Sequence, residues 1–401
     1  MVSLAERIAL WRALSRNLRV LKAGPRVNRF LLRYLRKFRV RNVGGNLIVH
    51  SHLPPINSPA YGRFVDEHIL GRTAGPSHAQ VGVTNACPQR CAYCYNKGRS
   101  GRAMDTATIE GVIRQLKEMG VFWLGLTGGE PLLNKDLPQI VESAGADCSV
   151  KLFTTGSTLT PQAASDLKKA GLFSVSVSLD DWREEQHDRA RGTPGAFREA
   201  LRAIEVFKNT DGLHVGVSAV LSREMIVRDE VEALLLFLTG LGVDEAWLSE
   251  AKPSAQGFWE SDLVITEAER KKLVALQDRY NRDGRMTVNY LGHFEGREHF
   301  GCNAGRKMVY VDAFGDVSPC VFVPLTFGNV MERDIGDIFA DMRRHFPSEE
   351  SCFINRNYAL LQKHGEGRIP LGTAESEKLL AEVRFGPLAR FFEIFTNRGP
   401  L

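Results

Sequence analysis

From about residue 79 to residue 250, short apolar and β-branched runs alternate with segments whose apolar residues recur at helical spacing. The runs predict strands over residues 80–84, 122–127, 150–154, 173–179, 214–221 and 245–249. The intervening segments predict helices, the first of them capped by Asp105. Repeated strand and helix pairs favour parallel strands joined by right-handed crossovers. The expected fold class is therefore α/β, a partial (β/α)6 barrel with a helical N-terminal leader and a small α+β C-terminal domain.

The first 42 residues differ from the body in charge. They contain twelve basic residues and one acid, so the leader carries +11 and the rest of the chain −6, although the net charge is only +5. Helical spacing of apolar residues over 4–21 and, after the Gly24-Pro25 break, over 27–38 predicts two amphipathic helices with arginine faces. Two interpretations stay open: the apolar faces dock on the body, or they lie in an anionic membrane surface. RNA contact and an organelle transit peptide are further alternatives.

Several protein classes are disfavoured by composition. No stretch approaches the roughly 18 uncharged apolar residues of a membrane-spanning helix, and arginines interrupt any apolar core of a secretory signal. The mildly acidic body argues against nucleic-acid binding over the whole surface. Seven cysteines, three of them within eight residues, predict metal ligation in a reducing compartment and not a disulfide framework. We therefore expect a cytoplasmic protein, peripheral at the inner membrane face if the leader binds lipid.

Three cysteines, Cys87, Cys91 and Cys94, follow the first predicted strand of the body as Cys-x3-Cys-x2-Cys. Three thiolates on one loop can hold three irons of a cubane cluster and leave the fourth iron free to bind a substrate or cofactor. A structural zinc site is the alternative, but it normally has four ligands at paired spacing. The nearest histidines, His68 and His78, lie upstream at no such interval.

This loop, with Tyr93 before its last cysteine, resembles the signature of the radical S-adenosylmethionine (SAM) enzymes. The segment Gly128-Gly129-Glu130-Pro131, after the second strand, resembles the family's Gly-Gly-Glu-Pro segment, which contacts the amino group of the bound methionine moiety. The resemblance covers residues 79–250, although Thr155 stands where many relatives have asparagine. The cofactor contacts that it implies are Tyr93, Gly128, Gly129, Glu130, Pro131, Thr155, Ser178, Asp180 and Arg191.

The same resemblance implies the chemistry. A 4Fe-4S cluster held by Cys87, Cys91 and Cys94 would cleave SAM reductively, and the resulting 5′-deoxyadenosyl radical would abstract hydrogen from a substrate. The protein's part is to hold the cofactor, exclude water and direct the attack to one C–H bond. No individual catalytic residue, and neither the attacked bond nor the fate of SAM, follows from the sequence.

Past residue 300, Cys302-x-x-Gly305, a Gly315-Asp316 turn and Cys320 resemble the start of the auxiliary-cluster extension called SPASM, or its shorter twitch form. Cys352 is the only later cysteine, so at most one auxiliary 4Fe-4S cluster fits. The resemblance implies that Cys302, Cys320 and Cys352 hold it, with one iron open or bound by another group. Ordinary buried thiols are the alternative, and Cys148, outside any motif, is expected to be one.

The expected organisation is a leader (1–75), the radical SAM barrel (76–255), a connecting helix and strand (256–300), the SPASM-like or twitch-like region (301–360) and a helical tail (361–401). Basic, aromatic-rich helices at both ends favour a lipid, isoprenoid or other membrane-associated small molecule as substrate. Peptide or RNA modification, or a non-catalytic iron-sulfur electron carrier, are the alternatives. The expected partners are a reductant such as ferredoxin or flavodoxin, the substrate, and an anionic membrane bound through residues 1–42; nucleic acid is not expected.

Overall fold

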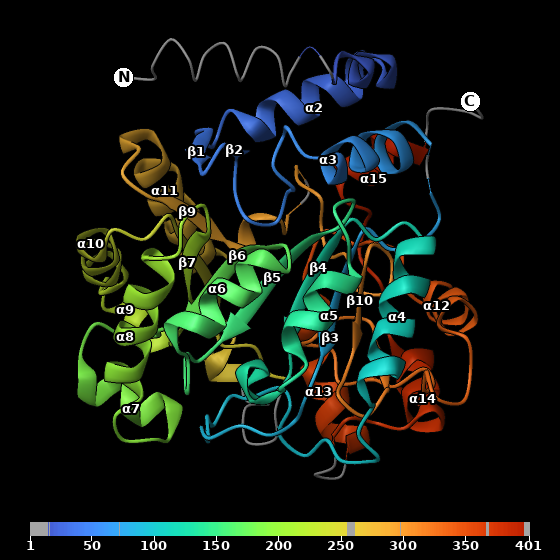
Figure 1. Ribbon diagram of the computed structural model, residues 1–401. Coiled ribbons are helices and arrows are strands. Elements are labelled where there is room, and N and C mark those ends of the chain that lie inside the picture. Colours follow the sequence, from blue (N-terminus) through green and yellow to red (C-terminus); the bar gives the residue numbers. More distant parts are fainter. Residues whose placement is uncertain are drawn as a thin grey trace.

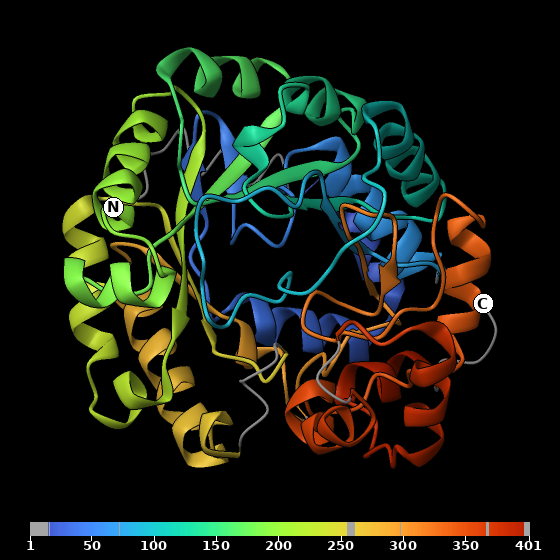
Figure 2. The same ribbon diagram turned by 90° about the horizontal axis from the view of Figure 1, so that it is seen from below.

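The computed structural model describes residues 15, 17–71, 73–254, 261–296, 298–365 and 369–396. Most of the first predicted leader helix, residues 4–21, lies outside these ranges. Nine strands form one sheet in the order β11-β10-β3-β4-β5-β6-β7-β8-β9. All neighbouring pairs are parallel except β10 and β11. The sheet curves into a partial barrel with helices around its outer face, which confirms the predicted fold class (Figures 1 and 2).

All six predicted strands are present, with ends within two residues of those expected. The further strands extend the sheet on both sides: β9 pairs with β8, and β10 of the C-terminal region pairs with β3. The strands are β3 (His78–Gly82), β4 (Trp123–Thr127), β5 (Ser149–Thr154), β6 (Leu172–Ser178), β7 (His214–Leu221), β8 (Glu245–Glu250), β9 (Thr287–Tyr290), β10 (Met308–Val311) and β11 (Val317–Ser318).

The helices follow the predicted pattern with two differences. The segment expected to form one helix over 227–241 forms two, because the chain turns at Asp229, whose φ is 57°. Helix α7 was not predicted, since it has few apolar residues. The helices of the body are α4 (Thr106–Glu118), α5 (Leu137–Ser143), α6 (Pro161–Lys169), α7 (Glu184–Arg191), α8 (Ala196–Lys208), α9 (Arg223–Val227), α10 (Val231–Leu241), α11 (Glu267–Asp283), α12 (Ile335–Arg343), α13 (Phe353–Gly365), α14 (Thr373–Glu382) and α15 (Arg390–Thr396), with short turns η3 (Pro131–Leu133), η4 (Ser261–Leu263) and η5 (Leu291–His293).

Local sequence accounts for several helix starts. The Asp105 carboxylate accepts a hydrogen bond from the Thr108 backbone N–H at 2.8 Å, as a residue that caps α4 should. At α11, the Thr266 hydroxyl and the Glu269 carboxylate each accept a hydrogen bond from the other residue's backbone N–H. The buried faces of these outer helices and of the sheet form the main hydrophobic core, which also contains Cys148, as predicted.

The leader covers the amino ends of the strands, on the side opposite the C-terminal helices α13 and α14 (Figure 1). Helix α2 buries Val27, Phe30 and Tyr34 against the body, so its apolar face docks as the first interpretation predicts. A strand hairpin after α2 was not predicted. The elements of the leader are η1 (Leu18–Ala23), α2 (Pro25–Leu35), β1 (Arg41–Val43), β2 (Asn46–Ile48), α3 (Pro59–Arg63) and η2 (Phe64–Leu70).

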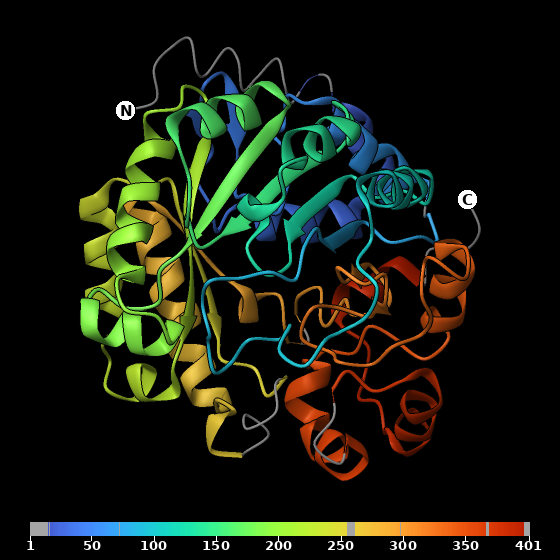
Figure 3. The same cartoon turned by 60° about the horizontal axis from the view of Figure 1, so that its bottom comes forward.

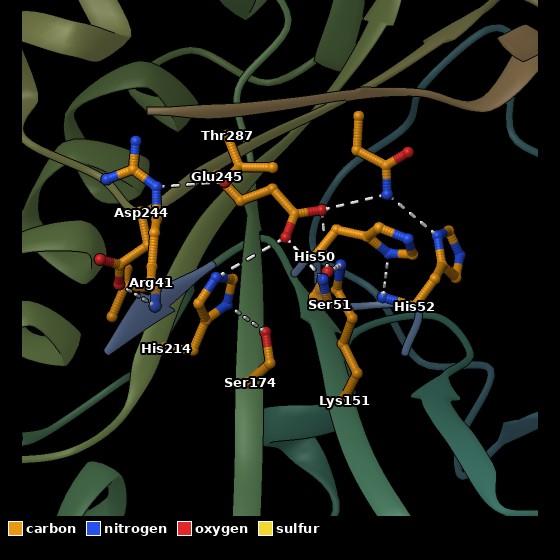
Figure 4. Close-up of polar contacts among 12 residues, drawn as sticks. Arg41, His50, Ser51, His52, Lys151, Ser174, His214, Asp244, Glu245 and Thr287 are labelled. Carbon is orange, nitrogen blue, oxygen red and sulfur yellow. Dashed lines mark hydrogen bonds and ion pairs between the residues drawn. The ribbon is translucent and has the colours of Figure 1, made fainter. Parts of the chain in front are cut away.

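A buried polar network joins the leader to the barrel interior (Figure 4). Glu245, at the start of β8, accepts hydrogen bonds from the Ser51 backbone N–H at 2.7 Å and from the Ser51 hydroxyl at 3.0 Å. The Lys151 ammonium donates to the same hydroxyl at 2.5 Å and lies 3.8 Å from the centre of the Trp247 ring. Burial lowers the pKa of His50 to about 4, so this neighbour is neutral at pH 7. The network therefore fixes the leader to the barrel through one acid and one ammonium.

Across the described part of the chain, every helix is too short or too polar to traverse a bilayer.

Candidate functional site

The cysteine loop crosses the carboxyl ends of the strands, where Figure 2 shows it across the mouth of the barrel. Cys87 is exposed, Cys91 and Cys94 are half-buried, and all three line one cavity of about 640 Å³. Burial raises the pKa of Cys87 to about 11, and the charges of Glu130 and the other two thiols add to this rise. A bound metal would reverse the effect, because iron ligation deprotonates a thiol.

The Gly128-Gly129 pair packs directly on the backbone of the cysteine loop. A Cβ atom on Gly128 would lie 2.2 Å from the carbonyl oxygen of Thr84, and one on Gly129 would lie 2.2 Å from that of Ala86. The Gly129 and Glu130 backbone N–H groups donate to these two oxygens at 2.6 and 2.7 Å. Both glycines also line the cavity. The pair therefore fixes the position of the cysteine loop, a role that the sequence interpretation, which considered only the ligand, did not include.

Glu130 is fully buried and is tied to the end of β5. Its carboxylate accepts hydrogen bonds from the Thr154 hydroxyl at 2.6 Å and from the Thr155 backbone N–H and hydroxyl at 2.5 Å each. Burial raises the pKa of Glu130, and these donors oppose the rise. Thr155 thus belongs to the same hydrogen-bonded group as Glu130 and lines the same cavity as the cysteine loop. Pro131 is buried beside it at the start of η3.

Asp180 and Arg191 form a buried ion pair beside the loop, with 2.7 Å between Arg191 Nη2 and Asp180 Oδ1. The Tyr93 hydroxyl donates to the other carboxylate oxygen of Asp180. Arg191 Nη1 lies 4.0 Å from Cys91 Sγ, and Arg191 Nε has no partner among the described residues. Ser178, at the end of β6, lines the cavity near this pair. Six of the residues proposed for the cofactor line the cavity: Tyr93, Gly128, Gly129, Thr155, Ser178 and Arg191. Glu130, Pro131 and Asp180 do not line it; Glu130 contacts Thr155, and Asp180 contacts Arg191.

Sequence reasoning missed a second buried connection of the loop. The Asn96 amide donates to the Gly128 carbonyl oxygen and accepts from the Tyr310 hydroxyl at 2.7 Å. Three residues later, Arg99 Nη1 contacts Asp312 Oδ2 at 2.9 Å, and both side chains are at most 2 % exposed. These contacts join the cysteine loop to β10 in the C-terminal region, and no motif marks them.

The three C-terminal cysteines also meet at this cavity, although they are far apart in sequence. N–H groups close to the sulfurs lower the pKa of these thiols. The backbone N–H groups of Phe353 and Ala304 act on Cys302, and those of Phe322 and Val323 act on Cys320. The Asn355 N–H and the Lys252 ammonium donate to Cys352.

Such donors suit thiolate ligands better than ordinary core thiols, because N–H groups stabilise a charged sulfur. Burial and the neighbouring thiols raise the pKa of Cys302 and Cys320 to about 12 although the N–H groups lower it, so these sulfurs are costly to ionise without a metal. No group of three or more His, Cys, Asp or Glu side chains within the described ranges surrounds the position of a single metal ion. A cubane cluster, in contrast, binds each cysteine at a different iron.

The residues therefore fit an iron-sulfur cluster and SAM at the barrel mouth: a three-cysteine loop, a glycine pair at its back, and an arginine beside it whose buried Nε–H has no partner in the described part of the chain. The two cysteine sets open into the same cavity, so one molecule in it can approach both. Figure 3 shows the C-terminal helices beside the cysteine loop at this end of the barrel.

Comparison with known proteins gives the same class. Residues 81–238 match the family model "Radical SAM superfamily", and residues 302–357 match "Iron-sulfur cluster-binding domain", the SPASM model. The mycofactocin maturase MftC of Mycolicibacterium smegmatis is 29 % identical over 60 % of this chain and 63 % of its own length. The PqqA peptide cyclase of Granulibacter bethesdensis is 24 % identical over 64 % and 72 %. The probable GTP 3′,8-cyclase of Methanococcus vannielii is 32 % identical over 60 % and 84 %.

A solved structure agrees in fold. Streptococcus suis SuiB bound to precursor peptide SuiA superposes with a TM-score of 0.57 and 16 % identity, over 78 % of both chains. This chain belongs to the radical SAM superfamily and carries a SPASM iron-sulfur extension. Membership implies a 4Fe-4S cluster, SAM and auxiliary iron-sulfur binding, as the sequence predicted. The match spans slightly less than two thirds of MftC, so the activity of the whole protein is a matter for proposal.

Proposed function

We propose that this chain is a radical SAM enzyme that modifies a peptide. The observation that carries the proposal is the single cavity that all six cysteines of the two sets line. A substrate there has room between the two proposed clusters. The relatives favour a peptide: one is named as a peptide cyclase, and the structural neighbour contains a precursor peptide. This reverses the order of the sequence-based expectation, which preferred a lipid or another membrane-associated small molecule.

In this proposal, Cys87, Cys91 and Cys94 hold the catalytic cluster, and Cys302, Cys320 and Cys352 hold one auxiliary cluster. When bound, the cluster and SAM supply the one-electron chemistry that removes a hydrogen atom from the substrate. The SAM contacts are Tyr93, Gly128, Gly129, Glu130, Pro131, Thr155, Ser178, Asp180 and Arg191.

The chain's own residues bind and orient these groups. The Arg191 guanidinium, held by Asp180 and next to Cys91, has one buried N–H left to donate to an anionic ligand atom. The cysteine loop and the C-terminal region border the cavity on two sides and limit the access of water to the reacting bond.

The test starts from anaerobically reconstituted protein with a chemical reductant and SAM. We expect 5′-deoxyadenosine, and none from a Cys87→Ala/Cys91→Ala/Cys94→Ala variant. A displayed peptide library selected on the immobilised holoprotein then supplies candidate peptides. The proposal requires that a selected peptide increases 5′-deoxyadenosine and changes in mass. Absence of 5′-deoxyadenosine would reject radical chemistry and favour an electron carrier, whereas radical chemistry that only RNA or lipid stimulates would reject the peptide.

A substrate with a large apolar part is the second candidate, because aromatic rings line the leader side of the cavity: Tyr34, Phe64, Phe294, Phe300, Phe391 and Phe395.

On the outer face, Leu18, Leu21 and Leu32 are more than half exposed among the leader arginines. This arrangement suits peripheral binding to an anionic membrane. Flotation with anionic liposomes tests it: equal soluble fractions with and without residues 1–42 would reject the membrane contact. A ferredoxin-type or flavodoxin-type reductant remains part of the proposal.

A further inference from the structure

One buried lysine contacts the proposed auxiliary site directly. Lys252 lies two residues beyond the carboxyl end of β8, and its side chain is 1 % exposed. The ammonium has three contacts: Glu250 Oε1 at 2.5 Å, Glu295 Oε1 at 3.0 Å and Cys352 Sγ at 3.6 Å. An ammonium group has three N–H donors, so these contacts use all of them. Its orientation toward the cysteine is therefore fixed from two sides by carboxylates.

The Lys252 ammonium differs in charge from the backbone N–H groups near the three C-terminal thiols. Among the described residues, backbone N–H groups act on Cys302 and Cys320, whereas Cys352 has one backbone N–H and the Lys252 ammonium, whose Nζ lies 3.6 Å from its sulfur. A backbone N–H is a neutral dipole, whereas the ammonium carries a full charge in a site that excludes water. The field at Cys352 is therefore stronger than at the other two sulfurs.

A positive charge beside a cluster ligand acts on the redox couple. Reduction by one electron adds one negative charge to the cluster and its thiolates, and a cation favours the more negative state. Reduction potentials of iron-sulfur clusters depend on net charge, hydrogen bonds to the sulfurs and solvent exposure. Lys252 supplies a positive charge and a hydrogen bond to a sulfur. Because its side chain is buried, water screens neither of them.

We propose that Lys252 is a positioning residue that raises the reduction potential of the auxiliary cluster through Cys352, with Glu250 and Glu295 holding its ammonium in place. The inference rests on the proposed assignment of Cys302, Cys320 and Cys352 as cluster ligands. It goes beyond that assignment because it names the residue that sets the cluster's tendency to accept an electron. A purely structural role for the ion cluster would leave the potential unchanged.

The experiment is an anaerobic redox titration of the full chain, followed by electron paramagnetic resonance. The catalytic-loop variant Cys87→Ala/Cys91→Ala/Cys94→Ala isolates the auxiliary signal, and the holoprotein with both clusters provides the comparison. The variants are Lys252→Arg, Lys252→Met and Lys252→Met/Glu250→Gln; the last avoids leaving both carboxylates without a cation. Lys151→Met is the matched control, because Lys151 is equally buried but contacts Ser51 and not a cysteine.

We expect Lys252→Arg to titrate close to the wild type. Lys252→Met should reduce the ratio of reduced to oxidised auxiliary cluster at least tenfold at a fixed potential, a shift of about 59 mV to more negative values for one electron. Lys252→Met/Glu250→Gln, which also removes one buried carboxylate, should shift the potential in the same direction by less. The catalytic cluster and Lys151→Met should be unchanged.

Four results would overturn the proposal, and they differ in cause. About four irons per wild-type chain would remove its premise, the auxiliary site. About eight irons with an unchanged potential in the Lys252 variants, or an equal shift in Lys151→Met, would reject only the role of Lys252. Loss of the auxiliary iron from every Lys252 variant, Lys252→Arg included, would show that the residue retains the cluster and does not set its potential.

Discussion

The Glu245 and Lys151 network permits a quantitative test of how the leader is attached to the barrel. The perturbation is a double-mutant cycle with Lys151→Met, Glu245→Gln and the double variant. The Ser51 hydroxyl bridges the two charges, because it lies 2.5 Å from Lys151 Nζ and 3.0 Å from Glu245 Oε1. At pH 6 the ammonium is charged, because its pKa in the folded protein is about 7. The carboxylate is also charged, since Lys151 and His214 lower its pKa.

The magnitude follows from this geometry. The two hydrogen bonds place the unit charges at most 5.5 Å apart, and at an effective dielectric constant near 20 such charges attract by about 3 kcal/mol. Removing one member of a buried pair costs about 3–5 kcal/mol, because the other charge stays buried without compensation. Glu245→Gln should therefore lose unfolding free energy, whereas Lys151→Met also removes the cost of burying the ammonium and should lose less. The double variant should differ from the sum of the two by up to about 3 kcal/mol.

The assay is urea unfolding under anaerobic conditions at pH 6, followed by fluorescence, because Trp247 stacks on Lys151 and reports on the network. The same cycle at pH 9, where Lys151 is neutral, is the internal control and should show little coupling. A coupling below about 0.5 kcal/mol at pH 6 would refute the reasoning, because independent sites add within that limit.

Three further predictions concern the site. Arg99→Met should destabilise the chain by about 3–5 kcal/mol in urea unfolding, because it leaves Asp312 buried without its cation; an effect below about 1 kcal/mol would contradict this. Gly129→Ala should displace the cysteine loop and lower iron retention in reconstituted protein, since its Cβ would lie 2.2 Å from a carbonyl oxygen; full iron content would disprove the packing argument. Cys352→Ser should reduce iron from about eight to about four per chain, whereas Cys148→Ser in the hydrophobic core should retain about eight.

The features that could be predicted from the sequence are those that depend on residues close together along the chain. The six strands, the Asp105 cap and the three-cysteine loop each depend on residues within a few positions of one another. The contact between Arg99 and Asp312, 213 residues apart, depends on β10 pairing beside β3, and no spacing rule indicates it. The Lys252 contact with Cys352 likewise follows from how β8 and α13 meet. Helix α7 was missed because seven of its eight residues are polar or charged, which leaves no apolar periodicity, and the Asn96 contacts have no sequence signal at all.

The pH dependence of stability follows from the same buried lysine. Burial lowers the pKa of Lys151 from 10.5 to about 7, so between these values the unfolded chain binds more protons than the folded one. The stability penalty is absent above pH 10.5 and grows as pH falls toward 7, which means that stability rises with pH across this window, by at most about 1.4 kcal/mol per unit. Lys307, also lowered to about 7, and the buried thiols titrate too, so the quantity to measure is the difference in unfolding free energy between the wild type and Lys151→Met. That difference should change in favour of the wild type from pH 7.5 to pH 9.5; a constant difference would mean that Lys151 has an ordinary pKa in the folded protein.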